Sequence, residues 1–166
     1  MLFDTLLENH TPDEILSVLA HEMGHWKLGH VWKQLMISSA VSLALFSGAY
    51  LVVNSAGFYS SFGFSSVTIY AGLFVLSIFA KPAAFLLSPI GAIVSRQFER
   101  QADDYAYAQI GSPDALISSL KELATHNLSN LHPDPFYAWF MYSHPPVVQR
   151  IRRLENMGRE AGTSPA

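Results

Sequence analysis

The chain has 166 residues, of which 50% are hydrophobic and 14% are charged, and its formal net charge is -3. This composition is unusually apolar for a soluble domain. The chain has no cysteine, which excludes disulfides, thiolate metal ligands and cysteine nucleophiles, and no basic stripe with interleaved aromatic residues marks a nucleic-acid partner. Any metal ion bound by this chain must therefore use histidine and carboxylate ligands.

The first helix is predicted to begin after Thr11. This residue can cap the helix, Pro12 suits the first helical position, and Glu14 stands where a capping box needs an acid. The apolar residues that follow predict that the helix continues to about His30.

This helix carries the motif His21-Glu22-Met23-Gly24-His25. Histidines four residues apart lie one turn apart on the same face of a helix, so both imidazoles can reach one metal ion. Glu22 projects about 100° further round the helix, where it can act as a general base. The motif is the HExxH arrangement of zinc peptidases, in which one short segment supplies two metal ligands and a base.

Two long apolar stretches follow. Residues 35–53 contain no charge and no proline, and their length is about that of one bilayer span. The alternative is a buried helix of a soluble protein, although such a helix seldom lacks a polar face. Residues 67–95 carry a single charge, at Lys81-Pro82, and predict one kinked span, because proline bends a membrane helix without ending it. We therefore expect a transmembrane hairpin in contact with membrane lipid.

The charges around this hairpin are unevenly distributed. Lysines precede the first span and arginines follow the second, whereas the connecting turn has neither: Lys27, Lys33, Arg96 and Arg100. By the positive-inside rule, both outer ends of the hairpin face the cytoplasm. The histidine pair and the segment after Ser95 are therefore expected on the same side of the membrane, close to its surface.

A catalytic zinc ion on two histidines needs a third protein ligand and an open position for water. His30 does not fit the known three-histidine pattern, which, counted from His25, requires histidine where this chain has Val31. Glu99, just after the second span, is returned to the histidine pair by the hairpin and is the candidate third ligand. Asp103, one turn further on, is a candidate to accept a hydrogen bond from a ligating histidine. The alternative is that both acids belong to a solvated, charged helix.

The C-terminal region is predicted to contain a helix after Ser112-Pro113, a loop over 131–142 and a basic helix over 147–157. His144, which precedes two prolines in a loop, has either a structural role or that of a hydrogen-bond donor to a reacting group. Altogether we expect an all-α integral-membrane protein with two transmembrane helices flanked by helical zinc-site segments. Its parts are the N-terminal segment with the HExxH helix, the transmembrane hairpin, the third-ligand and C-terminal region, and a disordered tail: 1–32, 33–95, 96–157 and 158–166.

The stretch Ala20–His30 resembles the active-site segment of the type I CAAX prenyl proteases, a family of integral-membrane zinc endopeptidases. Further segments are similar to motifs of the same family: Phe3–Leu6, Phe98–Asp103, and Tyr142–Pro146 with Arg150. The resemblance implies one Zn²⁺ per chain, held by His21, His25 and Glu99, with Glu22 as general base. It also implies that Asp103 supports the metal ligands and that His144 and Arg150 contact the substrate backbone or the developing oxyanion.

The same resemblance implies a substrate and a location. The family cleaves prenylated C-terminal CAAX peptides on the carboxyl side of the modified cysteine, by zinc-activated water, which predicts a site on the cytoplasmic side of the endoplasmic reticulum or of a bacterial inner membrane. Its members carry a long N-terminal region with several more spans, and this chain resembles their C-terminal catalytic portion. One alternative is an HtpX-like membrane quality-control metalloprotease. Another is an inactive fragment or a non-catalytic zinc-binding membrane scaffold.

Overall fold

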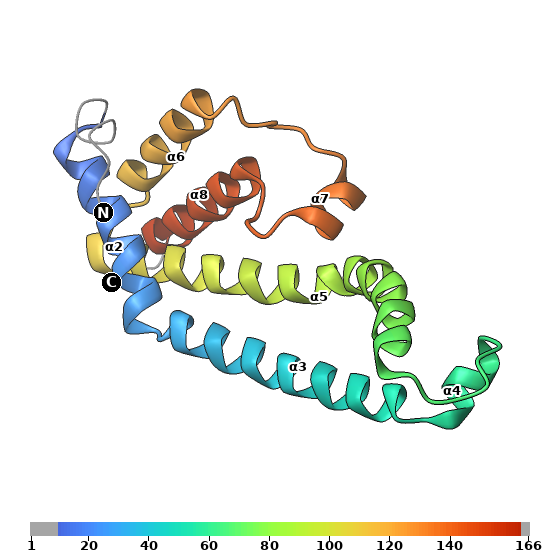
Figure 1. The fold of residues 1–166 in the computed structure, drawn as a ribbon. Helices are drawn as coiled ribbons and strands as arrows, with labels where there is room; N and C mark the ends of the chain where they lie inside the picture. Colours follow the sequence, from blue (N-terminus) through green and yellow to red (C-terminus); the bar gives the residue numbers. More distant parts are fainter. Residues whose placement is uncertain (1–9, 164–166) are drawn as a thin grey trace. The chain divides into compact units, whose positions relative to one another are not determined.

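The computed structural model describes residues 10–163, which form helices α2 to α8 and, within that range, no strand (Figure 1). The chain divides into two compact units, one made of Met1–His30 with Pro89–Ala166 and the other of Val31–Ser88. The predicted all-α fold with two candidate membrane-spanning helices is confirmed. The segment Phe3–Leu6, which contributed to the family resemblance, lies outside the described residues.

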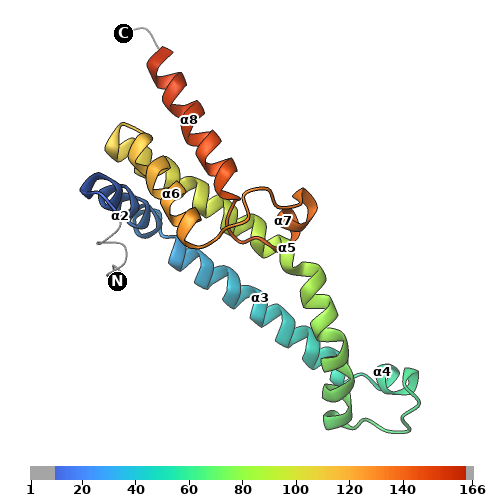
Figure 2. The same ribbon diagram turned by 90° about the horizontal axis from the view of Figure 1, so that it is seen from above.

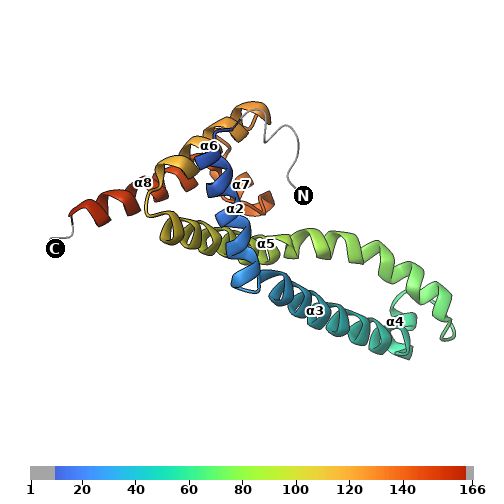
Figure 3. The same cartoon turned by 90° about the vertical axis from the view of Figure 1, so that its left-hand side faces the viewer.

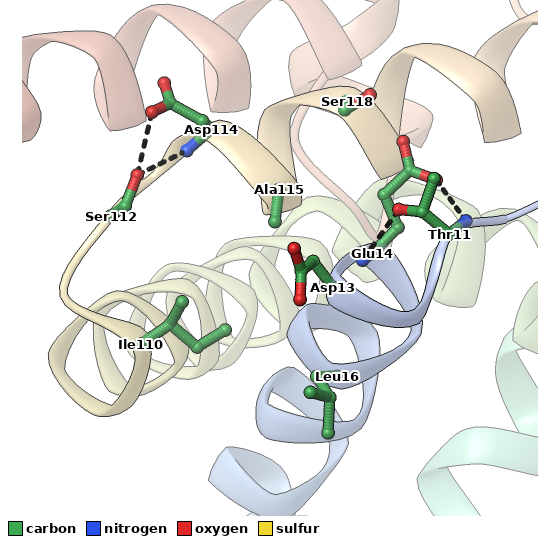
Figure 4. A pocket seen from close by; sticks show the side chains of 9 residues that line it. All are labelled: Thr11, Asp13, Glu14, Leu16, Ile110, Ser112, Asp114, Ala115 and Ser118. Carbon is green, nitrogen blue, oxygen red and sulfur yellow. Dashed lines mark hydrogen bonds between the residues drawn. The ribbon is translucent and has the colours of Figure 1, made fainter.

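Helix α2 (Pro12–Lys27) begins with the predicted capping box. The Thr11 hydroxyl accepts a hydrogen bond from the Glu14 backbone N–H at 3.3 Å, and the Glu14 carboxylate accepts one from the Thr11 N–H at 2.8 Å (Figure 4). The helix ends earlier than predicted, because Leu28 is its C-cap and Gly29 has a φ of +68°, a left-handed conformation that suits glycine. His30 is therefore the first residue of α3 (His30–Val53), and the predicted helix end near His30 is wrong.

The first unit has its core where four helices meet. Helix α6 (Asp114–His126) packs against both α2 and α8 (Val147–Thr163), and these helices gather around the C-terminal part of α5 (Ile69–Ile110) (Figure 3). The core consists of small and aliphatic side chains from these helices: Ala20, Ala106, Leu116, Ile117, Leu120 and Leu154. Burial of this apolar surface holds the histidine-bearing helix against the polar part of α5.

Two C-terminal predictions are corrected. The stretch expected to be a loop contains a short helix, α7 (Pro135–Met141), because the Asp134 carboxylate accepts the Tyr137 N–H at 2.9 Å and caps it. The tail expected to be disordered from residue 158 is helical as far as Thr163. Gly158 lies so close to the turn before α6 that an added Cβ would be 2.9 Å from Pro113 Cγ, and this tertiary contact supports the end of α8.

The second unit contains α3, α4 (Ala56–Ser61) and the first part of α5, with α4 connecting the end of α3 to the start of α5 (Figure 2). Tyr59 is 1% exposed, and its hydroxyl donates to the Val53 carbonyl at 2.9 Å. A Cβ on Gly72 would lie 2.2 Å from that hydroxyl, so α5 passes Tyr59 at a point where only glycine fits. One buried aromatic side chain thus joins the three elements.

Helices α3 and α5 are long and apolar enough to cross a membrane, and large apolar side chains such as Phe46 and Tyr70 are exposed along them. Helix α5 is continuous through Pro82 and Pro89. Membrane helices tolerate proline because neighbouring groups satisfy the hydrogen bond that the ring removes. The polar segment that carries Glu99 therefore belongs to the same helix as the second apolar stretch.

Candidate metal centre

Helix α2 directs both histidines of the HExxH motif toward one point. The Nε2 atoms of His21 and His25 lie 3.2 Å apart, and His21 is 8% exposed. Helix α5 adds the carboxylate of Glu99, which is also buried, at 3.6 Å from His21 Nε2 and 3.4 Å from His25 Nε2. The three predicted ligands, which come from two helices, therefore converge, with one donor atom of each lying within 4.8 Å of the others.

The spacing of these donor atoms fits a metal ion. Ligands at about 2.0–2.2 Å from a tetrahedral Zn²⁺ ion are separated from one another by roughly 3.3–3.6 Å. The two histidine Nε2 atoms lie 3.2 Å apart, and each has a Glu99 oxygen near this distance, Oε2 at 3.6 Å from His21 and Oε1 at 3.4 Å from His25. Two imidazole nitrogens and one carboxylate oxygen are also a donor set suited to zinc, and three protein ligands leave one position open.

A close contact between α2 and α5 places these ligands at that spacing. Gly24 lies between the two histidines in the sequence, and a Cβ added to it would lie 3.1 Å from the Ala102 Cα and 3.1 Å from the Tyr105 Cβ. Because backbone is one of the contacting groups, a larger side chain cannot be accommodated by a rotamer change. The absence of a side chain at Gly24 thus allows α2 to approach the helix that carries Glu99.

We expect Gly24→Val to lower the free energy of unfolding by about 1–3 kcal/mol, the usual cost of overpacking, and to weaken zinc binding because it pushes the two helices apart. Thermal unfolding and zinc competition against a chelator measure the two effects. Gly91→Val is the matched control, since Gly91 is likewise a helical glycine, in α5, and an added Cβ there meets nothing within 4 Å. Equal behaviour of the two variants would contradict this role of Gly24.

Asp103 and Arg150 lie behind His21. The Nδ1 atom of His21 is 3.0 Å from Asp103 Oδ1, and Asp103 is 1% exposed. Arg150, from α8, donates from Nη2 to Asp103 Oδ1 at 2.6 Å and from Nε to Oδ2 at 2.9 Å. This two-pronged contact fixes the carboxylate, which in turn orients the imidazole.

His144 reaches the site from the loop between α7 and α8. Its Nδ1 lies 3.1 Å from Glu99 Oε2, and its side chain is 65% exposed. Arg96 holds the start of this loop by donating to the Tyr142 carbonyl at 2.5 Å. Arg150 Nη1 lies 3.7 Å from the same Glu99 oxygen. The two C-terminal residues predicted to act on the substrate are therefore both brought to the site, Arg150 mostly buried and His144 largely exposed.

Glu22 is exposed on α2, beside His21 in the sequence. It is not one of the three converging donors. Its carboxylate is therefore available to solvent.

His30 is the site residue whose position sequence reasoning missed. The motif spacing excludes it as the third ligand, and in the structure it is 3% exposed and contacts His25 directly, with 3.1 Å between their Nδ1 atoms. The sequence signal for this position was a polar side chain directly after Gly29, the glycine that ends α2. The turn at Gly29, which the sequence spacing does not reveal, places that side chain beside His25.

The carboxylates around His21 change its acid–base behaviour. Burial by itself lowers the pKa of His21, but hydrogen bonding to Asp103 and Glu99 outweighs burial and raises the pKa to about 9. The neighbouring Glu99 likewise raises the pKa of His144. At neutral pH the metal-free site therefore holds a proton on His21.

This proton must leave when a metal ion binds. We expect zinc affinity to rise about tenfold between about pH 7 and about pH 8 and to level off above about pH 9, because each pH unit below the raised pKa of His21 favours the proton tenfold. Chelator competition, corrected for protonation of the chelator, measures this slope. His126→Ala, which changes an exposed histidine of α6 paired with Glu122, should preserve it. A pH-independent affinity would contradict the assignment.

Two histidines one helical turn apart, a buried carboxylate from a second helix and an exposed glutamate beside the first histidine define the site of a metallopeptidase. Comparison with known proteins agrees. Residues 1–158 match the model of Peptidase family M48, and the chain belongs to this family.

Three relatives illustrate the similarity. The chain is 40% identical over 157 residues to a CAAX prenyl protease 1 homolog of Oryza sativa subsp. japonica, covering 94% of this chain and 37% of that protein. It is 31% identical over 170 residues to CAAX prenyl protease 1 of Saccharomyces cerevisiae, covering 93% of this chain and 37% of that protein. The crystal structure of S. mikatae Ste24p matches with a TM-score of 0.78 at 31% identity, covering 93% of this chain and 39% of that one. The chain thus spans less than two-fifths of the length of these relatives.

Proposed function

We propose that this chain is the catalytic portion of a zinc-dependent membrane endopeptidase that cleaves prenylated CAAX-type substrates near their C-terminus. The observation that carries the proposal is the convergence of His21, His25 and Glu99 beside the exposed Glu22. The substrate class is supported by the names of the relatives, which are CAAX prenyl proteases.

The metal ligands and Glu22 have separate roles in peptide hydrolysis. His21, His25 and Glu99 would hold the ion, and Zn²⁺, when bound, supplies an activated water and polarises the scissile carbonyl. Glu22 accepts a proton from the attacking water and passes it to the leaving amine.

The remaining polar groups serve orientation and substrate contact. Asp103 fixes the ring of His21, and Arg150, bound to Asp103 by two donors, fixes Asp103. The Nδ1 atom of His144 faces Glu99, which leaves the far edge of this exposed ring to donate to the substrate or to the developing oxyanion. Arg150 Nη1 is the second group that we expect to contact the substrate backbone or the developing oxyanion.

We infer further that α3 and the apolar part of α5 anchor the chain in a membrane. The lysines before the first span and the arginines after the second support a cytoplasmic location for the metal site, because the intervening turn carries no positive charge. The substrate would then be a protein tail held at the cytoplasmic membrane surface by its prenyl group.

Cleavage of a farnesylated CAAX peptide beside its unprenylated twin, by the protein purified with lipid and zinc, tests this function. We expect cleavage of the prenylated peptide only. Equal cleavage of both peptides would favour the quality-control type of protease. Bound zinc without cleavage of either peptide would favour the non-catalytic scaffold.

A further inference from the structure

The side of His25 that faces away from the converging donors contacts a second imidazole. His30 Nδ1 lies 3.1 Å from His25 Nδ1, and His30 Nε2 lies 2.9 Å from Gln101 Oε1 on α5. The His30 ring is stacked on Phe98, with centroids 4.4 Å apart and an interplanar angle of 11°. Hydrogen bonds and one ring stack therefore connect the candidate ligand to α5 through four side chains: His25, His30, Gln101 and Phe98.

The positions of the protons in this contact follow from the ligand role of His25, so the inference rests on the proposed function. A neutral imidazole carries one N–H, and since Nε2 of His25 is the ligating atom, its proton is on Nδ1. That N–H donates to Nδ1 of His30, which must then carry its own proton on Nε2. The second N–H donates to the amide oxygen of Gln101, which is an acceptor only.

The two ligating histidines are thus oriented by different chemical groups. His21 faces the carboxylate of Asp103, whereas His25 faces a neutral imidazole. An anionic partner increases the basicity of a ligand, while a neutral one mainly fixes its tautomer and ring plane. Glu99 and Asp103 already place two carboxylates at this buried site. A neutral partner orients His25 without adding a third negative charge there.

We propose that His30 and Gln101 are positioning residues of the metal site, which hold His25 in its Nδ1–H tautomer and fix its ring plane through two consecutive hydrogen bonds. Neither residue touches the reacting atoms. Their effect reaches the site only through His25.

The decisive experiment compares two replacements of His30. His30→Asn keeps an acceptor near the position of Nδ1 but loses the ring that stacks on Phe98. His30→Phe keeps a stacked ring but loses the acceptor. We expect His30→Phe to weaken zinc binding roughly 10–100-fold and His30→Asn to weaken it by only about a few-fold, measured by chelator competition. A pure packing role predicts the opposite order.

Folding is followed separately, through the melting temperature of each metal-free variant. His126→Phe, at an exposed histidine of α6, is the control and should bind zinc as the unmodified chain does. Wild-type zinc affinity in a folded His30→Phe variant would overturn the proposal. An unmodified chain that binds no zinc would overturn the proposed function as well, which separates the two failures.

Gln101 provides an independent test that leaves both rings in place. Gln101→Leu removes the acceptor that keeps the His30 proton on Nε2, so His30 can place its proton on Nδ1, opposite the N–H of His25. We expect about tenfold weaker zinc binding and a mixture of His30 tautomers in ¹⁵N NMR spectra. A His30 protonated on Nδ1 in the zinc-loaded unmodified chain would overturn the proposal.

Discussion

The Glu22→Gln variant is expected to bind zinc like the unmodified chain and to lose roughly 10²–10⁴-fold in peptide hydrolysis, the usual contribution of a general base. Glutamine preserves the size of the side chain but has no carboxylate to accept a proton. Zinc binding should not change, because Glu22 is exposed and is not among the three converging donors.

Zinc content per chain and the rate of cleavage of the prenylated peptide are the two measurements. Glu122→Gln is the matched control, since Glu122 is a half-buried acid on α6 whose partner is His126 rather than a residue of the site. Full activity of Glu22→Gln would eliminate Glu22 as the base.

Glu99→Ala should release the metal. The change removes one of three donors and leaves two histidines from a single helix. We expect the loss of affinity to exceed the roughly 10–100-fold that removal of an outer partner costs. Glu99 is also buried beside His144 and Arg150, so its removal takes away the negative charge that both groups face.

Zinc content after dialysis checks this result, with Asp103→Asn and Glu122→Ala for comparison. Asp103→Asn should lower zinc affinity only by the roughly 10–100-fold expected for the partner of a ligating histidine. Glu122→Ala should leave zinc affinity unchanged. If Glu99→Ala kept its full zinc content, the third ligand would have to be sought at Asp103 or Glu122.

The metal centre shows where sequence reasoning succeeds. Histidines four apart in a helix share a face whatever the rest of the fold, and the Thr11 capping box starts a helix, α2, that includes both His21 and His25, with His25 in its last turn. The hairpin predicted from the two apolar stretches returns Glu99 to the histidine pair, and the structure brings this carboxylate within 3.6 Å of both imidazoles. The chemical roles of these residues stay predictions until the variants are measured.

The failures have a common cause. The end of α2 at Lys27, the capped α7 and the extension of α8 to Thr163 depend on single local or tertiary contacts that average composition does not reveal. A tail of small residues resembles a disordered segment unless Gly158 is known to pack on Pro113.

The helical class, the two apolar stretches and the shared face of His21 and His25 therefore follow from the sequence alone, because they depend on periodicity and composition within one segment. The folded chain was needed to show that Asp103 contacts both His21 and Arg150, and that His30 turns back onto His25. Those contacts join residues of separate helices. The contact of His21 with Asp103 depends on how closely α2 approaches α5 at Gly24, and the contact of His30 with His25 depends on the turn at Gly29.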